Sequence, residues 1–274
     1  MPLQTKSELM AGLRAQIAAL ETPLSRAGRP HFRLGLSEVD ALLPDGGLLR
    51  GGVHEVAAAS YGDMAAAVGF AAALAVRACE DCHLRPVVWC QQGWGAYDMG
   101  QLYAPGLAGF GLDPSRLLLV NPSREPDMLW ALEECLRSGV LAAIVGEVPS
   151  CSRHFNLRAS RRLQLAAEDA STPLILLRGH EEGLSASAAQ TRWRVTSRSA
   201  RDQGQLVAAS QPCWDVMLEK CKGGSSFSRL LVWNGVSGCF EIAQDRTLSK
   251  VQENVRKISP PVLTAAACVL SETA

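Results

Sequence analysis

The sequence has few aromatic residues, no excess of charge of either sign and no long apolar run. Aromatic side chains make up 5% of the 274 residues, and 27 basic residues are matched by 27 acidic ones. A chain without net charge has no overall field that attracts nucleic acid, so a DNA contact would need a local basic patch. No segment approaches the roughly 18 consecutive apolar residues of a membrane-spanning helix, so we expect no membrane contact.

Cysteine is present without a disulfide pattern. The nine cysteines are odd in number and scattered, which predicts reduced thiols in a cytoplasmic protein. The first residues also lack the apolar stretch of a secretory signal, because Lys6, Glu8 and Arg14 interrupt it. We therefore expect a cytoplasmic location.

One cysteine pair matches a known signature. Cys79, Cys82 and His83 fit the C-x-x-C-H pattern of haem attachment, and zinc binding is a second interpretation. Zinc needs a second pair of ligands, but the nearest other cysteine, Cys90, falls inside a predicted buried strand. We therefore favour surface thiols with no cofactor.

Short apolar runs alternate with helical patterns from Val53 to Leu177. Apolar strands separated by helices predict an α/β fold with a mostly parallel central sheet flanked by helices. After Gly179 apolar and polar residues alternate, which predicts antiparallel strands on the C-terminal side, with Trp193 and Trp214 in the core. The expected strands are 53–56, 87–90, 117–120, 141–145, 174–177, 192–196, 214–218, 230–233 and 239–242, and the expected helices are 64–80, 126–138 and 156–168.

Two terminal segments are expected to flank a main domain of residues 31–243. Residues 1–30 are expected to form an amphipathic helix and a linker, because a capping box at Thr5–Glu8 precedes apolar residues at helical spacing. This apolar stripe is a candidate docking surface, either for the chain's own domain or for a partner. Residues 244–274 are polar and then broken by proline, so we expect a mobile tail. The stripe consists of Leu9, Leu13, Ile17 and Leu20.

The junction after the first long strand resembles a phosphate-binding loop that has lost its chemistry. Such loops carry G-x-x-x-x-G-K-[ST], in which the lysine meets the β/γ-phosphates and the hydroxyl holds magnesium. Here Ala58 replaces the first glycine, while Gly62 is retained. Asp63 and Met64 occupy the places of the lysine and the hydroxyl, and an aspartate there repels a triphosphate. We therefore expect a structural turn that binds no nucleotide or metal.

Two further strand ends lack the residues of an ATPase. The strand 87–90 is followed by Gln91, and glutamine cannot act as a base where a glutamate could activate water. The strand 141–145 is followed by Gly146 in the place of a magnesium-binding aspartate. Glu147 comes next and is predicted to face away from the site, because successive strand residues point to opposite faces. These losses predict that the chain is not an enzyme.

Basic residues gather on the expected helix 156–168. Arg158, Arg161 and Arg162 are at positions i, i+3 and i+4, so they predict one cationic face. This face is a solvated surface, a contact for DNA phosphates or a contact for an acidic partner. A second basic group follows in the C-terminal half: Arg192, Arg194, Arg198 and Arg201.

A leucine, aspartate and glycine pattern ahead of the first long strand matches a known protein core. The pattern lies at Leu34–Asp40 and Gly46–Gly51 and is followed by Glu55 and Val56. It resembles the start of the ATPase core of RecA recombinases, and the chain is more similar to the ImuA family from about residue 34 to 235. The ordered set of further similar stretches is specific: 102–107, 111–120, 129–134, 137–139, 160–167 and 191–195.

The resemblance implies an accessory role in SOS-induced translesion DNA synthesis and mutagenesis. It implies contacts with ImuB, with RecA and, through ImuB, with an error-prone polymerase of the DNA polymerase III alpha type. It also implies action through protein contacts more than nucleotide turnover, with a weak DNA contact and a cytoplasmic, nucleoid-associated location. Two alternatives stay open: an unusual RecA-like ATPase that uses Glu147 or Asp63 for metal, and a SulA-like inhibitor of cell division.

A lysine pair near the C-terminal strands suggests a finer hypothesis. Lys220 and Lys222 follow the strand 214–218, at a place similar to that of the RecA Lys-x-Lys pair that reaches the neighbouring protomer's ATP site. A protomer with this pair but without a phosphate site could cap a RecA filament, and the stripe from Leu9 to Leu20 resembles the RecA element that packs on the adjacent protomer. The alternative is a solvated hairpin end.

Overall fold

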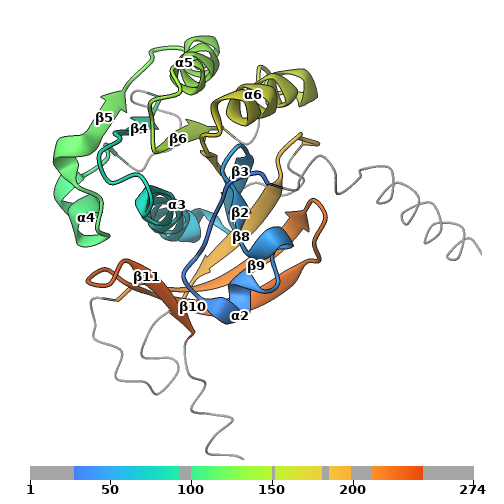
Figure 1. Ribbon diagram of the computed structural model, residues 1–274. Coiled ribbons are helices and arrows are strands. Elements are labelled where there is room, and N and C mark those ends of the chain that lie inside the picture. The colour runs from blue at the N-terminus through green and yellow to red at the C-terminus, as the bar shows by residue number, and fades with distance from the viewer. Residues whose placement is uncertain (1–27, 93–99, 150–151, 181–184, 199–210, 243–274) are drawn as a thin grey trace, which may run out of the picture.

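Within the described residues, nine strands form one sheet through the centre of the protein (Figure 1). The computed structural model describes residues 28–92, 100–149, 152–180, 185–198 and 211–242. The strand order is β11-β10-β9-β8-β3-β7-β6-β4-β5. The strands are β3 (Val53–Ala58), β4 (Val87–Cys90), β5 (Leu117–Val120), β6 (Ala143–Val148), β7 (Leu174–Arg178), β8 (Thr191–Ser197), β9 (Cys213–Cys221), β10 (Phe227–Asn234) and β11 (Cys239–Ile242).

The sheet is mostly parallel and becomes antiparallel on the C-terminal side. From β8 through β3, β7, β6 and β4 to β5, each neighbouring pair is parallel. The pairs β8–β9, β9–β10 and β10–β11 are antiparallel. This arrangement confirms the fold predicted from the alternation of apolar runs and helices.

Helices cover both faces of the parallel part of the sheet (Figure 1). On one face α3 packs against β3, β6, β7 and β8, and on the other α5 and α6 pack side by side. Strand residues alternate between these layers: Trp89 faces α3, whereas Val88 and Cys90 face α5 and α6. The helices are α2 (Ser37–Asp40), α3 (Met64–Cys79), α4 (Ala104–Gly109), α5 (Glu125–Arg137) and α6 (Leu157–Ala170), with 3₁₀ turns at Pro44–Gly46, Tyr61–Asp63 and Pro114–Arg116.

The core helix α3 is buried on most of its circumference because its side chains are small. Its sequence, MAAAVGFAAALAVRAC, lets the sheet and the loops approach closely. A Cβ added at Gly69 would lie 3.0 Å from Phe110 Cζ and 3.2 Å from Trp214 Cζ2. Among the described residues, one helical stretch, Tyr61–Cys79, is long and apolar enough to cross a membrane, and 72% of its apolar 18-residue window is buried inside the protein.

Aromatic side chains attach the antiparallel strands to α3. Phe70 of α3 lies 5.6 Å from Trp193, 5.7 Å from Trp214 and 5.6 Å from Phe240, measured between ring centroids. Trp193 and Trp214 are buried, which confirms their prediction as core residues. The C-terminal strands therefore share one core with the parallel part of the sheet.

The segment ahead of β3 forms a small antiparallel pair, β1 (His31–Phe32) with β2 (Leu48–Leu49), and the helix α2. The Asp40 carboxylate accepts hydrogen bonds from the backbone N–H groups of Leu34 (2.8 Å), Gly35 (3.2 Å) and Leu36 (3.2 Å). Gly35 has a φ of +86°, which a residue with a side chain adopts only with strain. The leucine and aspartate pattern of this region is thus explained by a capped turn.

The predicted terminal segments lie outside the described residues. These are the N-terminal helix with Leu9, Leu13, Ile17 and Leu20, and the tail 244–274.

Candidate functional site

In the turn between β3 and α3, the Asp63 side chain accepts hydrogen bonds from the turn and from the neighbouring strand. The Asp63 carboxylate is buried and accepts three side-chain or backbone hydrogen bonds: from Ser60 Oγ (2.6 Å), from Ser197 N (2.7 Å) and from Ser197 Oγ (2.7 Å). Ser60 belongs to the turn, whereas Ser197 ends the neighbouring strand β8. The turn is therefore fastened to the sheet at the place where a phosphate-binding loop would surround its ligand.

The electrostatics of this turn favour an ionised carboxylate. Burial alone would raise the pKa of Asp63, but the hydrogen bonds from Ser60 and Ser197 outweigh it and lower the pKa below its usual value. Asp63 is the residue that precedes α3, and the positive end of a helix dipole stabilises a negative charge there. The chain itself thus supplies an anion at the N-terminus of α3.

The backbone of the turn is also engaged. The N–H of Ala59 donates to Val195 O (2.9 Å), which continues the pairing of β3 with β8, and Arg194 Nη1 donates to Ala58 O (3.3 Å). In a phosphate-binding loop these amides are free to surround the phosphates. Met64, at the place of the hydroxyl residue, is buried in the core. The N–H of Ala59 is therefore not free to surround a phosphate.

The expected orientation of the residues at the end of β6 is wrong by one position. Gly146 faces α5, because a Cβ added there would lie 2.8 Å from both Cδ atoms of Leu132. Glu147 faces α3 and lies beside Gln91 at the carboxyl ends of β6 and β4. Gly146 is therefore a packing residue, and Glu147 lies on the side of the β3–α3 turn.

Glu147 and Gln91 line a cavity of about 160 Å³ beside the first turn of α3. The chain runs from β4 through α4 to β5 at the edge of the sheet, and from β6 through α6 to β7 towards the centre. The connections that leave the neighbouring strands β4 and β6 thus run in opposite directions. The cavity therefore lies at a topological switch point, where α/β proteins bind ligands. The other lining is mainly apolar, and includes Met64, Val68, Leu102 and Leu177.

The carboxyl group in this cavity is poorly suited to bind magnesium. Burial raises the pKa of Glu147, although a hydrogen bond from Trp89 Nε1 (2.9 Å) and one from Gln91 act against the rise. A raised pKa opposes the ionised form of the carboxyl group, which is the form that Mg²⁺ prefers as a ligand. Among the described residues, no three or more His, Cys, Asp or Glu side chains are grouped to hold a metal ion.

The lysine pair does not extend away from the protein, contrary to the filament-capping hypothesis. Lys220 Nζ donates to Ser187 O (2.8 Å) and Lys222 Nζ donates to Ala188 O (3.1 Å). Lys220 lies within β9, which continues to Cys221 and is longer than expected. Burial and the nearby Lys222 lower the pKa of Lys220. Both ammonium groups thus bind the segment ahead of β8 in their own chain.

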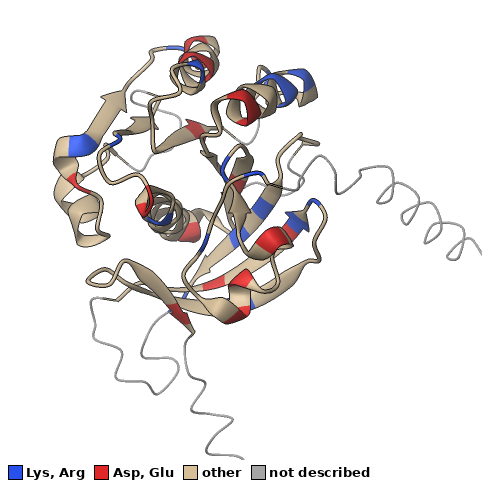
Figure 2. Ribbon diagram, in the orientation of Figure 1, with Lys and Arg blue, Asp and Glu red and all other residues tan. Residues whose placement is uncertain are grey.

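Figure 2 shows basic residues along α6. All three of its predicted arginines are exposed, and among the described residues only Arg162 has an ion pair. Arg162 pairs with Glu133 of α5, which also pairs with Arg137. Arg158 and Arg161 lie in the first half of the helix. The predicted cationic face is therefore present at Arg158 and Arg161, whereas the charge of Arg162 is partly balanced.

Contrary to expectation, the two cysteines of the C-x-x-C-H pattern are not both surface thiols. Cys79 is buried at the end of α3, and burial raises the pKa of its thiol to about 11. Cys82 is half-buried, and its carbonyl accepts a hydrogen bond from Arg116 Nη2 (2.9 Å). Cys79 is a core residue, so the interpretation as a surface thiol is wrong for it.

A buried ionic cluster was missed in the sequence. Glu55 of β3 is fully buried and pairs with Arg178 Nη1 of β7 (3.1 Å) and with Arg192 Nε of β8 (2.7 Å). Arg178 is also fully buried, and its guanidinium carbon lies 4.3 Å from the centre of the Phe155 ring. A charged residue within the apolar strand 53–58 was the available signal.

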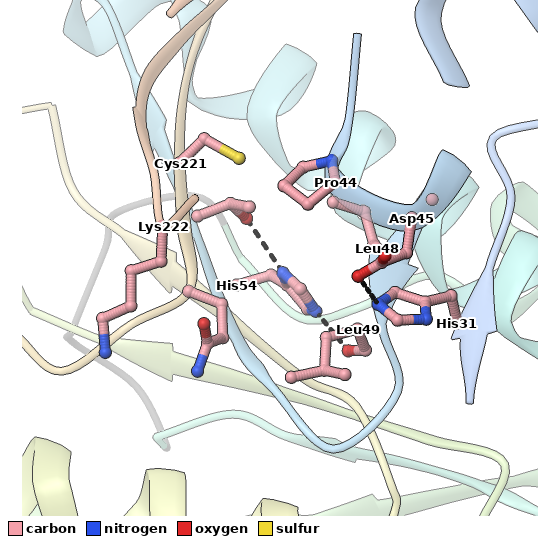
Figure 3. A pocket seen from close by; sticks show the side chains of 11 residues that line it. His31, Pro44, Asp45, Leu48, Leu49, His54, Cys221 and Lys222 are labelled. Carbon is pink, nitrogen blue, oxygen red and sulfur yellow. Dashed lines mark hydrogen bonds and ion pairs between the residues drawn. The ribbon is translucent and has the colours of Figure 1, made fainter. Parts of the chain in front are cut away.

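His54, next to Glu55, was also missed. Its Nε2 donates to Leu49 O (2.9 Å; Figure 3). Its Nδ1 accepts from Thr191 Oγ1 (2.8 Å), which itself accepts from Trp193 Nε1. Burial lowers the pKa of His54 from 6.5 to about 4, so the ring is neutral. The adjoining pocket of about 30 Å³ has room for little more than one water molecule. The His54 network is therefore a structural link between β2, β3 and β8.

The strand order, the two helix layers and the β3–α3 junction define a protein of the RecA-like fold class. Among solved structures, a KaiC-like protein from the hyperthermophilic archaeon Pyrococcus horikoshii OT3 has a TM-score of 0.51 with this chain. The match covers 78% of this chain and 99% of that protein at 14% sequence identity, so it supports the fold alone.

Sequence similarity shows the family. The chain is 32% identical over 211 residues to Protein ImuA of Caulobacter vibrioides strain NA1000 / CB15N, which covers 73% of this chain and 82% of that protein. Protein ImuA of strain ATCC 19089 / CIP 103742 / CB 15 matches to the same extent. No family model matches the chain. The chain belongs to the ImuA family.

Proposed function

We propose that this chain is a non-catalytic accessory protein of damage-induced translesion DNA synthesis. In this role it binds ImuB and RecA in the cytoplasm and works with an error-prone polymerase of the DNA polymerase III alpha type through ImuB. The RecA-like domain serves as a scaffold for protein contacts, and ATP turnover has no part in it. Membership of the ImuA family supports the setting of this role.

One observation carries the non-catalytic part of the proposal. The Asp63 carboxylate occupies the N-terminus of α3 and is held by Ser60 and Ser197. A triphosphate at this turn would meet a fixed negative charge instead of a lysine, and would have to displace hydrogen bonds to a charged group that each contribute about 1.5–3 kcal/mol. Glu147, with its raised pKa, offers magnesium little compensation.

Calorimetric titration of the full chain with Mg·ATP tests this part. We expect no saturable binding up to about 1 mM ATP, which corresponds to a binding free energy weaker than about 4 kcal/mol. An Asp63→Lys, Met64→Thr variant restores the two side chains of the motif but neither its first glycine, which is Ala58 here, nor a free N–H at Ala59, so it should also fail to bind. Tight, magnesium-dependent binding by the native chain would overturn the proposal and favour an unusual ATPase.

Co-purification with ImuB and with RecA tests the partners separately. We expect both to be retained by the full chain, and we expect a variant with Leu13→Asp and Ile17→Asp in the N-terminal stripe to lose at least one of them. The matched control is Arg14→Asp, between these two positions, which leaves the apolar residues intact. Retention of neither protein by the native chain would refute the adaptor role even if ATP does not bind.

A further inference from the structure

The outer surface of α5 and α6 contains a groove that has no role in the proposed function. It has a volume of about 630 Å³ and runs between the two helices. We call it the α5–α6 groove; its lining includes Glu133, Arg137, Arg162, Leu165, Ala166 and Asp169. Because the two helices lie on the face of the sheet opposite to α3, the groove is separate from the β3–α3 turn and from the Glu147 cavity (Figure 1).

Large apolar side chains are exposed beside this groove. Leu165, which lines it, is 44% exposed, and Trp130 on α5 is 64% exposed. Trp130 is three residues ahead of Glu133, which lines the groove, so the two side chains are neighbours on α5. Tryptophan and arginine are the residue types that most often dominate protein interfaces. This surface therefore has the composition of a contact region.

The basic residues of the same surface retain hydrogen-bonding capacity. Arg158 and Arg161 are exposed and make no ion pair within the described residues. Arg162 uses one of its terminal nitrogens on Glu133, and its side chain remains 60% exposed. A guanidinium has five N–H donors, so these three side chains can still bind carboxylates in pairs of hydrogen bonds.

The acidic residues in the groove argue for a protein rather than a nucleic acid. Glu133 and Asp169 line it, and Glu134 lies one position further along α5 in an ion pair with Arg137. A phosphate backbone would be repelled by these carboxylates and would leave Leu165 uncovered. A peptide can place apolar side chains on Leu165 and carboxylates on the arginines, and so avoid Glu133 and Asp169.

We propose that the α5–α6 groove binds an acidic, amphipathic segment of a partner protein, with apolar anchors on Leu165 and carboxylates on Arg158, Arg161 and Arg162. The long terminal segments of the chain itself do not fit this description, because neither is acidic. The segment 1–27 has Lys6, Arg14 and Arg26 against Glu8 and Glu21, and the segment 243–274 has Arg246, Lys250, Arg256 and Lys257 against Asp245, Glu253 and Glu272. The occupant therefore comes from another protein, whichever partner supplies it.

Selection of peptides from a displayed random library on the immobilised full chain tests this proposal. The enriched peptides should combine Asp or Glu with Leu, Ile or Phe spaced three or four residues apart. Synthetic copies labelled with fluorescein should then bind the native chain in an anisotropy titration. Binding should weaken by about tenfold or more for Arg158→Glu with Arg161→Glu, and by a similar factor for Leu165→Asp.

Matched controls separate the groove from general charge and from misfolding. Arg229→Glu changes an exposed arginine on β10 and should leave peptide binding unaltered. The pair Arg158→Lys and Arg161→Lys should retain most of the binding. The melting temperature should not fall in the glutamate variant, because negative charge is favourable near the N-terminus of α6.

Three outcomes would overturn the proposal. The first is no enrichment of acidic, apolar peptides, and the second is peptide binding that the arginine and leucine changes do not affect. The third is binding of labelled single-stranded or duplex DNA that the Arg158→Glu, Arg161→Glu variant abolishes while no peptide binds, which would assign the surface to nucleic acid. None of these outcomes depends on whether ImuB and RecA are partners.

Discussion

Replacing Glu55 by glutamine should strongly destabilise the fold, because it would remove the buried carboxylate that pairs with the buried Arg178. Glu55 and Arg178 are both fully buried, and their atoms Oε1 and Nη1 are 3.1 Å apart. The second carboxylate oxygen is 2.7 Å from Arg192 Nε. Glutamine has the same shape, but it is neutral and one of its two terminal groups is a donor that faces an arginine donor.

The expected loss follows from the burial of the pair. Removing one partner of a buried salt bridge costs about 3–5 kcal/mol, because the remaining charge is uncompensated in a medium that solvates it poorly. Phe155 beneath the guanidinium of Arg178 offsets part of this loss, since a desolvated cation–π contact contributes about 2 kcal/mol. We therefore expect Glu55→Gln to lower the free energy of unfolding by about 3 kcal/mol.

Urea unfolding followed by tryptophan fluorescence measures this change, with the m-value showing whether the transition is comparable. A double-mutant cycle with Arg178→Met should give a coupling energy of about 1–3 kcal/mol, because the two residues contact each other directly. Asp127→Asn, in the exposed pair with Arg124, is the control and should not shift the midpoint. A loss below about 1 kcal/mol for Glu55→Gln, or additive effects in the cycle, would refute the reasoning.

Three further predictions concern the pH dependence of stability. The pKa of His54 falls from 6.5 to about 4 on folding, so the unfolded chain binds more protons than the folded chain between these pH values. The free energy of unfolding should therefore drop by about 3 kcal/mol as the pH falls from 6.5 to 4. In His54→Gln, the urea midpoint should lose this dependence on pH. Burial raises the pKa of Glu147, so the stability that this group contributes is lost as the pH rises through its folded pKa. Glu147→Gln should therefore have a higher melting temperature than the native chain at pH 8 but not at acidic pH. An equal change in melting temperature at both pH values would contradict this prediction. The pKa of Asp63 is lowered in the folded chain, so its contribution to stability is present above the unfolded pKa of 3.8 and is lost as the pH falls through the folded value. Asp63→Asn should lower the free energy of unfolding by about 1–3 kcal/mol at pH 7 and by progressively less in acid. Urea unfolding measures this change.

The helices, the strands and the loss of the phosphate-binding motif could be predicted because their signals are local. The helix expected at 126–138 forms at Glu125–Arg137, and the one expected at 64–80 forms at Met64–Cys79. Each has apolar residues at helical spacing and a residue that ends it, such as Gly139, whose φ is +65°. These features depend on neighbours along the chain and not on the rest of the fold.

The contacts of the candidate site could not be predicted because they depend on strand order and on register. Glu55 meets Arg178 and Arg192 only because β3 lies between β7 and β8. The faces of Gly146 and Glu147 were assigned the wrong way round because a shift of one residue in a strand exchanges its two faces. The lysines of β9 bind carbonyl groups of the segment ahead of β8, a contact that no spacing in the sequence indicates.

The carboxylate at the start of α3 also bears on regulation. Proteins that sense a nucleotide change their loops when the γ-phosphate is gained or lost, and this alternation times their activity. Here the anion is covalently part of the polypeptide, so it can be neither released nor exchanged. For the proposed accessory role, timing would then come from outside the domain, through how much of the protein is made and how much of each proposed partner is present, since mass action sets the occupancy of a binding surface.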